Sequence, residues 1–281
     1  MAAATCGASD CTTCVLSGLN RTTAIRRSSV PRPTLASIGV RGHAGTMSAL
    51  QLALLYAAKT ALAEPSSLWL EFGVWRGGST RQLFDGRRTL LQDRWDNAST
   101  LIFGFDSFQG LPEDWRAPTA HQHNAERIGN RYLRKGAFSL YGKPPFEQRG
   151  IDWVPGWFNE TLPGFLDRHA GSDVTLVHID ADLYTSAHTV LTTLWRERRL
   201  HPGALLVFDE LINYPQYASG ELKALCDLLE LSGRSVQVLG TAASMVLSDA
   251  TAIAAAIRKQ HWGRETPHAG AYRQDAAFVL R

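Results

Sequence analysis

The chain has 281 residues, of which 44% are hydrophobic and 20% are charged, as is usual for soluble globular proteins. This length allows one large domain or two small ones with a substantial core. The formal net charge of +3 at pH 7 is too small to predict nucleic acid as a partner. The sequence contains no run of about 18 apolar residues, so we also expect no membrane span and no membrane partner.

Residues 1–42 are rich in Ser, Thr, Ala and Arg and show neither helical nor strand periodicity. We expect them to form either a disordered tail or an organelle transit segment, because the apolar core of a secretory signal is missing. Three of the four cysteines, Cys6, Cys11 and Cys14, lie in this segment, whereas Cys226 is distant. We therefore expect a reducing compartment without a disulfide framework, and a cytoplasmic protein.

From residue 43 onward, segments of helical and strand periodicity alternate along the chain. Thr46 is placed to cap a helix through residues 47–64, and a glycine-rich turn at 73–78 opens another helix. We expect strands at 66–73, 99–106, 151–158, 174–180, 203–209 and 234–240, and further helices at 160–169, 184–198 and 219–232. Residues 107–150 are polar and aperiodic, so we expect them to form a lid.

The alternation of strands with helices predicts an α/β fold with a mainly parallel sheet and helices on both faces. We expect residues 243–248 to pair with 234–240 as a terminal antiparallel hairpin. On this basis residues 43–248 form the domain, and residues 249–281 form a C-terminal extension packed on it.

Acidic residues follow the predicted strands at the point where each strand ends. Glu71, Asp106, Asp180 and Asp209 all lie at or next to such ends. Open α/β sheets bind ligands at the carboxyl ends of their strands. A bare carboxylate at the end of a buried strand is costly unless a cation, a hydrogen-bonding ligand or water compensates it. We therefore expect the four acids to belong to one binding site.

The first half of this site is the turn "LEFGVWRGGST" at residues 70–80. Gly73 and Gly77 permit a tight backbone and the close approach of a ligand, although their spacing departs from the GxGxxG dinucleotide fingerprint. Asp106 is placed either to accept hydrogen bonds from both hydroxyls of a ribose or to cap a turn or helix. Glu71 adds negative charge, which favours S-adenosylmethionine, a nucleoside with a positive sulfonium and no phosphate.

The second half of the site combines the ends of two later strands. Asp180, Asp209 and Glu210 are expected to supply three oxygen ligands at one edge of the sheet. Carboxylates with water suit Mg²⁺, and also Mn²⁺ or Ca²⁺, whereas no cluster of Cys or His predicts zinc. Asp182 is placed to act as a base or as a hydrogen-bond acceptor beside the metal. The alternative for Asp180 and Asp182 is to cap the helix that follows, and His178 is expected to be a hydrogen-bonded core residue.

Five motifs occur in an order that resembles one family of enzymes: "EFGVWRGGST", "FDSFQGLPEDW", "GWFNETLPGFL", "HIDADLY" and "PGALLVFDELINYP". From about Thr46 to Leu247 the chain resembles the macrocin O-methyltransferase family of class I S-adenosylmethionine-dependent methyltransferases. The resemblance implies a Rossmann-like fold with a seven-stranded sheet, Mg²⁺, and methyl transfer to a hydroxyl, often on a sugar of a natural product. The chain departs from the antibiotic-tailoring members, which usually carry Asp-Asp-Tyr where it has Asp209-Glu210-Leu211.

The resemblance also assigns roles to individual residues. It places the cofactor turn on Glu71 to Gly77, with Val74 and Trp75 included, the ribose-binding acid on Asp106, and the metal triad on Asp180, Asp209 and Glu210. Further cofactor contacts fall on the first helix and within the matched motifs, at Thr46, Met47, Ser107, Phe108, Gly156 and Trp157. The catalytic base is then Asp180 or Asp182.

The predicted function is Mg²⁺-dependent methyl transfer from S-adenosylmethionine to a hydroxyl of a small molecule, with Mn²⁺ as an alternative ion. Two other readings stay open. One is a metal-dependent, hydroxylase-like relative on the same scaffold, and the other is a non-catalytic module that binds the cofactor. The sequence also leaves a monomer and a homo-oligomer open.

Overall fold

The computed structural model describes residues 48–60, 62–96, 99–115, 133–211, 217–241 and 274–281 of the chain. The predictions made for residues 1–42, for Thr46 and for Met47 lie outside these ranges. Within them, no helix combines the length and the apolar character that crossing a membrane requires.

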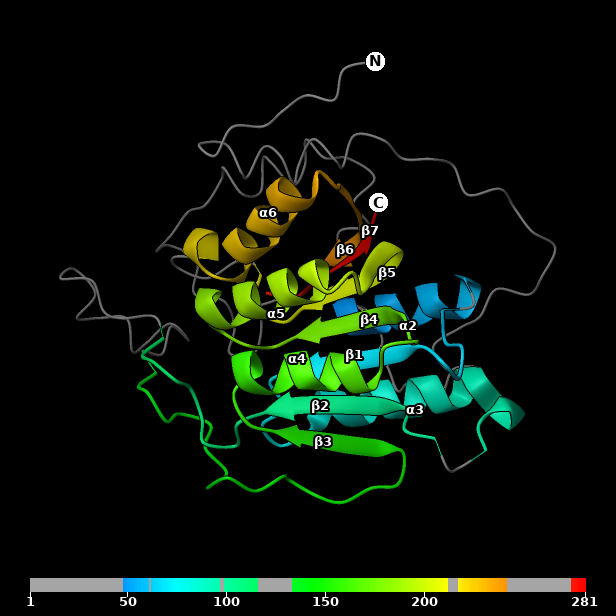
Figure 1. Cartoon of the computed structure of the whole chain (residues 1–281), viewed down its shortest axis with the longest axis horizontal. Coiled ribbons are helices and arrows are strands. Elements are labelled where there is room, and N and C mark those ends of the chain that lie inside the picture. Colours follow the sequence, from blue (N-terminus) through cyan, green and yellow to red (C-terminus); the bar gives the residue numbers. More distant parts are fainter. Residues whose placement is uncertain (1–47, 61, 97–98, 116–132, 212–216, 242–273) are drawn as a thin grey trace, which may run out of the picture.

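Seven strands of the described chain form one sheet, which confirms the predicted fold class (Figure 1). Their spatial order is β3-β2-β1-β4-β5-β7-β6. Five of them pair in parallel, namely β1 (Leu68–Phe72), β2 (Ile102–Asp106), β3 (Ile151–Pro155), β4 (Val174–Ile179) and β5 (Leu200–Phe208). The strand β7 (Ala276–Leu280) lies antiparallel between β5 and β6 (Val236–Thr241). The carboxyl ends of the five parallel strands therefore meet at one edge of the sheet.

Helices cover both faces of the sheet. One face carries α4 (Phe158–Arg168), α5 (Tyr184–Arg196) and α6 (Glu221–Ser232), and the other carries α2 (Ala49–Thr60) and α3 (Gly78–Leu91), as Figure 1 shows. Two short 3₁₀ turns, η3 (Gln92–Arg94) and η5 (Tyr217–Ser219), complete the described helical segments.

Each face of the sheet has its own apolar core, because successive side chains of a strand point to opposite faces. In β1, Leu70 and Phe72 join the core beneath α4, α5 and α6, whereas Trp69 joins the core beneath α2 and α3. All five residues of β1 are buried. The sequence "LWLEF" therefore lacks the polar alternation of a half-exposed strand, as expected for a strand in the middle of a parallel sheet.

The C-terminal end of the chain differs from the prediction. Residues 276–280 form β7 and pair with both β5 and β6, so they belong to the sheet and are not an extension packed on it. The strand β6 accordingly pairs with β7, while its predicted hairpin partner, residues 243–248, lies outside the described ranges. A five-residue apolar run such as "AAFVL" does not reveal its partner strand, because periodicity alone carries no pairing information.

The cysteine prediction also needs a correction. Cys226 on α6 is disulfide-bonded in the structure, whereas the sequence analysis expected a reducing compartment without a disulfide framework. The other three cysteines lie outside the described residues.

Candidate functional site

A cavity of about 690 Å³ opens at the carboxyl ends of β1, β2, β4 and β5. Its lining includes ten of the predicted site residues, namely Gly73, Val74, Trp75, Asp106, Ser107, Trp157, Asp180, Asp182, Asp209 and Glu210. Four other predicted residues do not line it: Glu71, Gly77, Phe108 and Gly156. The two halves that the sequence predicts thus share one cavity.

The turn after β1 brings these two halves into direct contact at Gly73. Its φ of +88° lies in the left-handed region, where a side chain is strained. A Cβ atom at this position would lie 1.8 Å from the backbone oxygen of Asp180, which follows β4. Only glycine therefore allows the turn to pack against the loop that carries the acidic residues.

Asp106, the last residue of β2, holds this turn in place. Its Oδ2 accepts hydrogen bonds from the backbone N–H groups of Val74 (2.9 Å) and Trp75 (3.1 Å). Its Oδ1 accepts one from the N–H of Phe108 (2.7 Å). A carboxylate has about four acceptor positions, so capacity remains for a ligand hydroxyl in the cavity that Asp106 lines. The capping and ligand-binding roles left open by the sequence are thus compatible.

Glu71 lies in the interior and not in the cavity where the sequence analysis placed it. The residue is fully buried and accepts a hydrogen bond from the hydroxyl of Thr80 on α3. Its Oε1 also lies 3.1 Å from Nδ1 of the buried His178 on β4. Glu71 therefore ties β1, β4 and α3 together beneath the turn, and His178 is the hydrogen-bonded core residue that was predicted.

The pair formed by Glu71 and His178 gives a prediction for stability. Burial favours the neutral imidazole, but the hydrogen bond with Glu71 and the negative charges of Glu71, Asp209 and Asp275 outweigh it and raise the pKa of His178. A raised pKa means that the charged pair stabilises the fold fully below the unfolded value of about 6.5 and less as the pH rises through the folded value.

We expect His178→Gln to lower the free energy of unfolding by about 1–3 kcal/mol at pH 5.5, and by less at pH 9. Denaturant unfolding of both proteins in the presence of a chelator would measure this difference. A loss that is the same at both pH values would contradict the charged pair.

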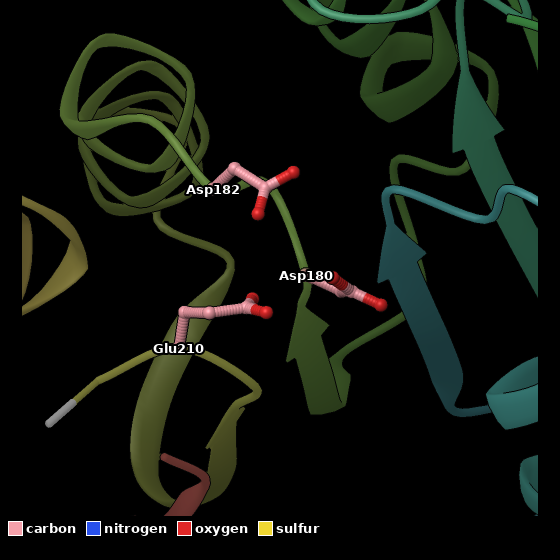
Figure 2. A group of neighbouring side chains, drawn as sticks. All are labelled: Asp180, Asp182 and Glu210. Carbon is pink, nitrogen blue, oxygen red and sulfur yellow. The ribbon is translucent and has the colours of Figure 1, made fainter. Parts of the chain in front are cut away.

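Three carboxylates converge at the other end of the cavity (Figure 2). Oxygen atoms of Asp180, Asp182 and Glu210 all lie within 4.8 Å of one another, and we call these three residues the acidic cluster. Asp180 and Asp182 come from the loop after β4, and Glu210 comes from the loop after β5. Asp209, which was predicted as a ligand, lines the same cavity but is exposed and is not part of the cluster.

The alternative that these acids cap the following helix is not supported for Asp182. The N-cap residue of α5 is Leu183, and no side chain makes a capping hydrogen bond there. Asp182 instead has a φ of +61°, a conformation uncommon for residues other than glycine. Such conformations are found preferentially at functional sites, because the surrounding structure must hold them.

Two members of the acidic cluster, Asp180 and Glu210, carry negative charge that no lysine or arginine of the described residues offsets. Burial, followed by the charges of neighbouring carboxylates, raises the pKa of Asp180 and of Glu210 well above the usual values. Among the described residues, no lysine or arginine forms an ion pair with Asp180, Asp209 or Glu210. The Oε2 atom of Glu210 is moreover buried without a hydrogen-bond partner in the described chain. A bound cation would remove these penalties.

The described parts of the predicted lid fold back over the start of α5. Trp115 and Leu133 form an antiparallel bridge, which joins the two ends of the segment whose middle lies outside the described residues. Leu111 and Trp115 form a small apolar cluster with Leu183. The hydroxyl of Thr185 donates a 2.7 Å hydrogen bond to Glu113. These contacts place Leu111 in the wall of the cavity.

The sequence analysis missed Glu221, the first residue of α6. It is fully buried, and its Oε1 accepts a 3.0 Å hydrogen bond from the N–H of Ala181. A signal was present, because Glu221 shares the apolar face of the helix with Leu225 and Leu228, at spacings of four and seven residues. An acid on a buried helix face requires a partner.

Comparison with protein families gives a match to the family described as Macrocin-O-methyltransferase (TylF), over residues 35–221. A comparison with curated proteins gives no match. Among solved structures, the calicheamicin methyltransferase CalS11 is 23% identical, with 66% of this chain and 73% of that chain covered and a TM-score of 0.46.

Two further structures show more distant likenesses. The O-methyltransferase NovP is 21% identical, covers 66% of this chain and 75% of its own, and has a TM-score of 0.42. The Podospora anserina methyltransferase PaMTH1 is 16% identical, covers 84% and 80%, and has a TM-score of 0.39. The family match spans well over half of the chain, from before α2 to the start of α6. The chain therefore belongs to the macrocin O-methyltransferase family and is an S-adenosylmethionine-dependent O-methyltransferase.

Proposed function

We propose that the protein transfers a methyl group from S-adenosylmethionine to a hydroxyl of a small molecule, such as a sugar of a natural product, with the help of Mg²⁺. The observation that carries this proposal is the shared cavity. It joins the turn held by Asp106 to the acidic cluster, with Gly73 packed on the backbone of Asp180 between them. A methyl donor at the first half and a hydroxyl at the second would meet without either leaving the cavity.

The cofactor is expected to lie along the turn after β1. Asp106 has acceptor capacity for a ribose hydroxyl, and Ser107 and Trp157 line the same cavity. Glu71, in contrast, acts from beneath the turn through Thr80 and His178. Gly77, Phe108 and Gly156 were also predicted to contact the cofactor. None of the three lines the cavity, so they would act on the cofactor only indirectly, through neighbouring residues that do.

The acidic cluster fits a divalent cation. All its donors are carboxylate oxygens, which Mg²⁺ and Mn²⁺ prefer, and one of them, Oε2 of Glu210, is buried without a partner in the described chain. We propose Asp180, Asp182 and Glu210 as the holding residues, with Asp209 at the rim of the same cavity. In this set, Asp182 takes the place that Asp209 has in the triad expected from the family.

A bound Mg²⁺ would lower the pKa of the acceptor hydroxyl and orient it. The chain's own residues supply the rest of the chemistry. An Oδ atom of Asp180 or Asp182 accepts the hydroxyl proton, the acceptor oxygen forms a bond to the methyl carbon, and the carbon–sulfur bond breaks with its electrons on sulfur. The sulfonium becomes a neutral thioether, and the carboxylate that accepts the proton becomes neutral as well.

The remaining walls of the cavity suit a small acceptor with both polar and apolar surface. Leu111, Pro112 and Phe138 provide apolar area from the lid, and Thr185 and Ser186 provide hydroxyls from α5. A pocket with mostly apolar walls and a few convergent polar groups is typical of small-molecule sites.

The function is tested by incubating the protein with methyl-labelled S-adenosylmethionine, Mg²⁺ and a library of hydroxylated metabolites, and by following label in the products. We expect label on an acceptor oxygen. Oxidised products without label would favour the hydroxylase-like alternative, and cofactor binding without turnover on any acceptor would favour the non-catalytic module.

For the cofactor half, we expect Asp106→Ala to weaken binding of S-adenosylmethionine at least tenfold, which corresponds to about 1.4 kcal/mol. The variant loses an acceptor for the ribose and also frees the N–H groups of Val74 and Trp75, which hold the turn. Isothermal titration calorimetry would measure the affinity, with Asp85→Ala on the exposed side of α3 as the control. Unchanged affinity in Asp106→Ala would remove this residue from the site.

A further inference from the structure

Glu221 is a buried acid that contacts a backbone N–H of the loop carrying the acidic cluster. Its Oε1 accepts the N–H of Ala181 at 3.0 Å, and its Oε2 is buried without a hydrogen-bond partner in the described chain. Its oxygens are not among those that lie within 4.8 Å of one another in the cluster. Glu221 therefore contacts the loop that carries the cluster and does not share the space between the cluster's oxygens.

The loop in question is a strained turn. Ala181 lies between Asp180 and Asp182, and its carbonyl accepts a 2.6 Å hydrogen bond from the N–H of Leu183. This bond between residues two apart closes the turn on Asp182, whose φ is +61°. A left-handed conformation at a residue other than glycine persists only where its surroundings fix it.

The contacts around this turn fix it from both sides. The N–H of Asp180 donates to the carbonyl of Phe72 at 2.9 Å, which continues the pairing of β4 with β1. The carbonyl of Asp180 packs against Gly73, and the next N–H in the chain, that of Ala181, is held by Glu221. Of these contacts, only the last comes from a side chain, and it reaches across from α6.

We propose that Glu221 is a positioning residue for the divalent cation. By holding the N–H of Ala181, it keeps the turn in the conformation that brings the carboxylate of Asp182 beside those of Asp180 and Glu210. This inference rests on the proposed metal site. The role requires an acceptor oxygen at Oε1 and not a negative charge, because the group it holds is a neutral backbone N–H.

The experiment compares full-length parent protein, Glu221→Gln and Glu221→Ala, with Glu230→Ala, an exposed acid on the same helix, as the matched control. Affinity for Mn²⁺ is measured by electron paramagnetic resonance, and exchange of the Ala181 amide by hydrogen–deuterium exchange. We expect Glu221→Ala to weaken Mn²⁺ binding at least tenfold and to speed exchange at Ala181. Glu221→Gln, which keeps the acceptor oxygen, should stay within about threefold of the parent.

Either of two results on Mn²⁺ affinity overturns the proposal. One is an alanine variant with the parent's Mn²⁺ affinity, and the other is a glutamine variant that loses as much as alanine, because charge and not position would then matter. A parent that binds no Mn²⁺ would overturn the metal site itself, and equal exchange at Ala181 in the parent and the alanine variant would overturn the holding role as well. If Glu221→Ala fails to fold, Glu221→Met fills the same space without an acceptor.

Discussion

Chelation of divalent cations is expected to abolish methyl transfer, and added Mg²⁺ or Mn²⁺ is expected to restore it. The reason is the charge of Asp180 and Glu210, because burial and the charges of neighbouring carboxylates raise the pKa of both. Without a cation, the charges of these carboxylates repel one another and the acceptor hydroxyl keeps its high pKa. Initial rates before and after dialysis against a chelator would measure the effect.

Asp180→Asn should have the same consequence in the presence of Mg²⁺, with a loss of activity of about two orders of magnitude or more. The substitution keeps the size of the side chain and removes one ligand charge. Affinity for S-adenosylmethionine should change little, because Asp106 and the turn after β1 form the other half of the cavity. Asp173→Asn, an exposed acid just before β4, is the matched control.

Asp209→Asn then discriminates between the two ligand sets. A smaller loss than in Asp180→Asn would support the acidic cluster of Asp180, Asp182 and Glu210. A loss of equal size, together with a mild effect of Asp182→Asn, would support the triad expected from the family. Full activity of the metal-free protein would make all of these carboxylates structural, and Asp180 would then be a metal-free base.

Gly73→Ala is expected to remove both folding stability and activity. A Cβ atom would lie 1.8 Å from the oxygen of Asp180, and this oxygen is backbone at the end of a central strand, so it cannot move aside alone. The φ of +88° adds strain for any residue with a side chain. We expect a loss of about 3 kcal/mol or more in the free energy of unfolding.

The control for this variant lies five residues further on. Gly78 opens α3, and a Cβ atom there would meet no other atom within 4 Å. Gly78→Ala should therefore leave the melting temperature unchanged or raise it slightly, because alanine favours the helix by up to about 1 kcal/mol. Thermal unfolding followed by circular dichroism would measure both variants. A Gly73→Ala protein that melts with the parent would show that the turn and the Asp180 loop can separate.

Much of the site was accessible from local sequence because its physical causes are local. Asp106, Asp180 and Glu210 each follow an apolar run that reads as a buried strand, and parallel strands bring their carboxyl ends to one edge. Which acids then meet is a matter of side-chain direction. The left-handed turn at Asp182 brings its carboxylate close to those of Asp180 and Glu210, whereas Asp209 is exposed and is not part of the acidic cluster. No spacing rule contains that information.

The sequence by itself determined the α/β fold class and the positions of most strands and helices, and it predicted the two halves of the site, because periodicity and strand-end residues depend on near neighbours along the chain. Only the tertiary structure decided how distant segments combine. It placed residues 276–280 inside the sheet, Glu71 beneath the turn with His178, and Glu221 against Ala181. Each of these depends on a contact between residues at least 40 positions apart, which hydrophobic periodicity does not encode.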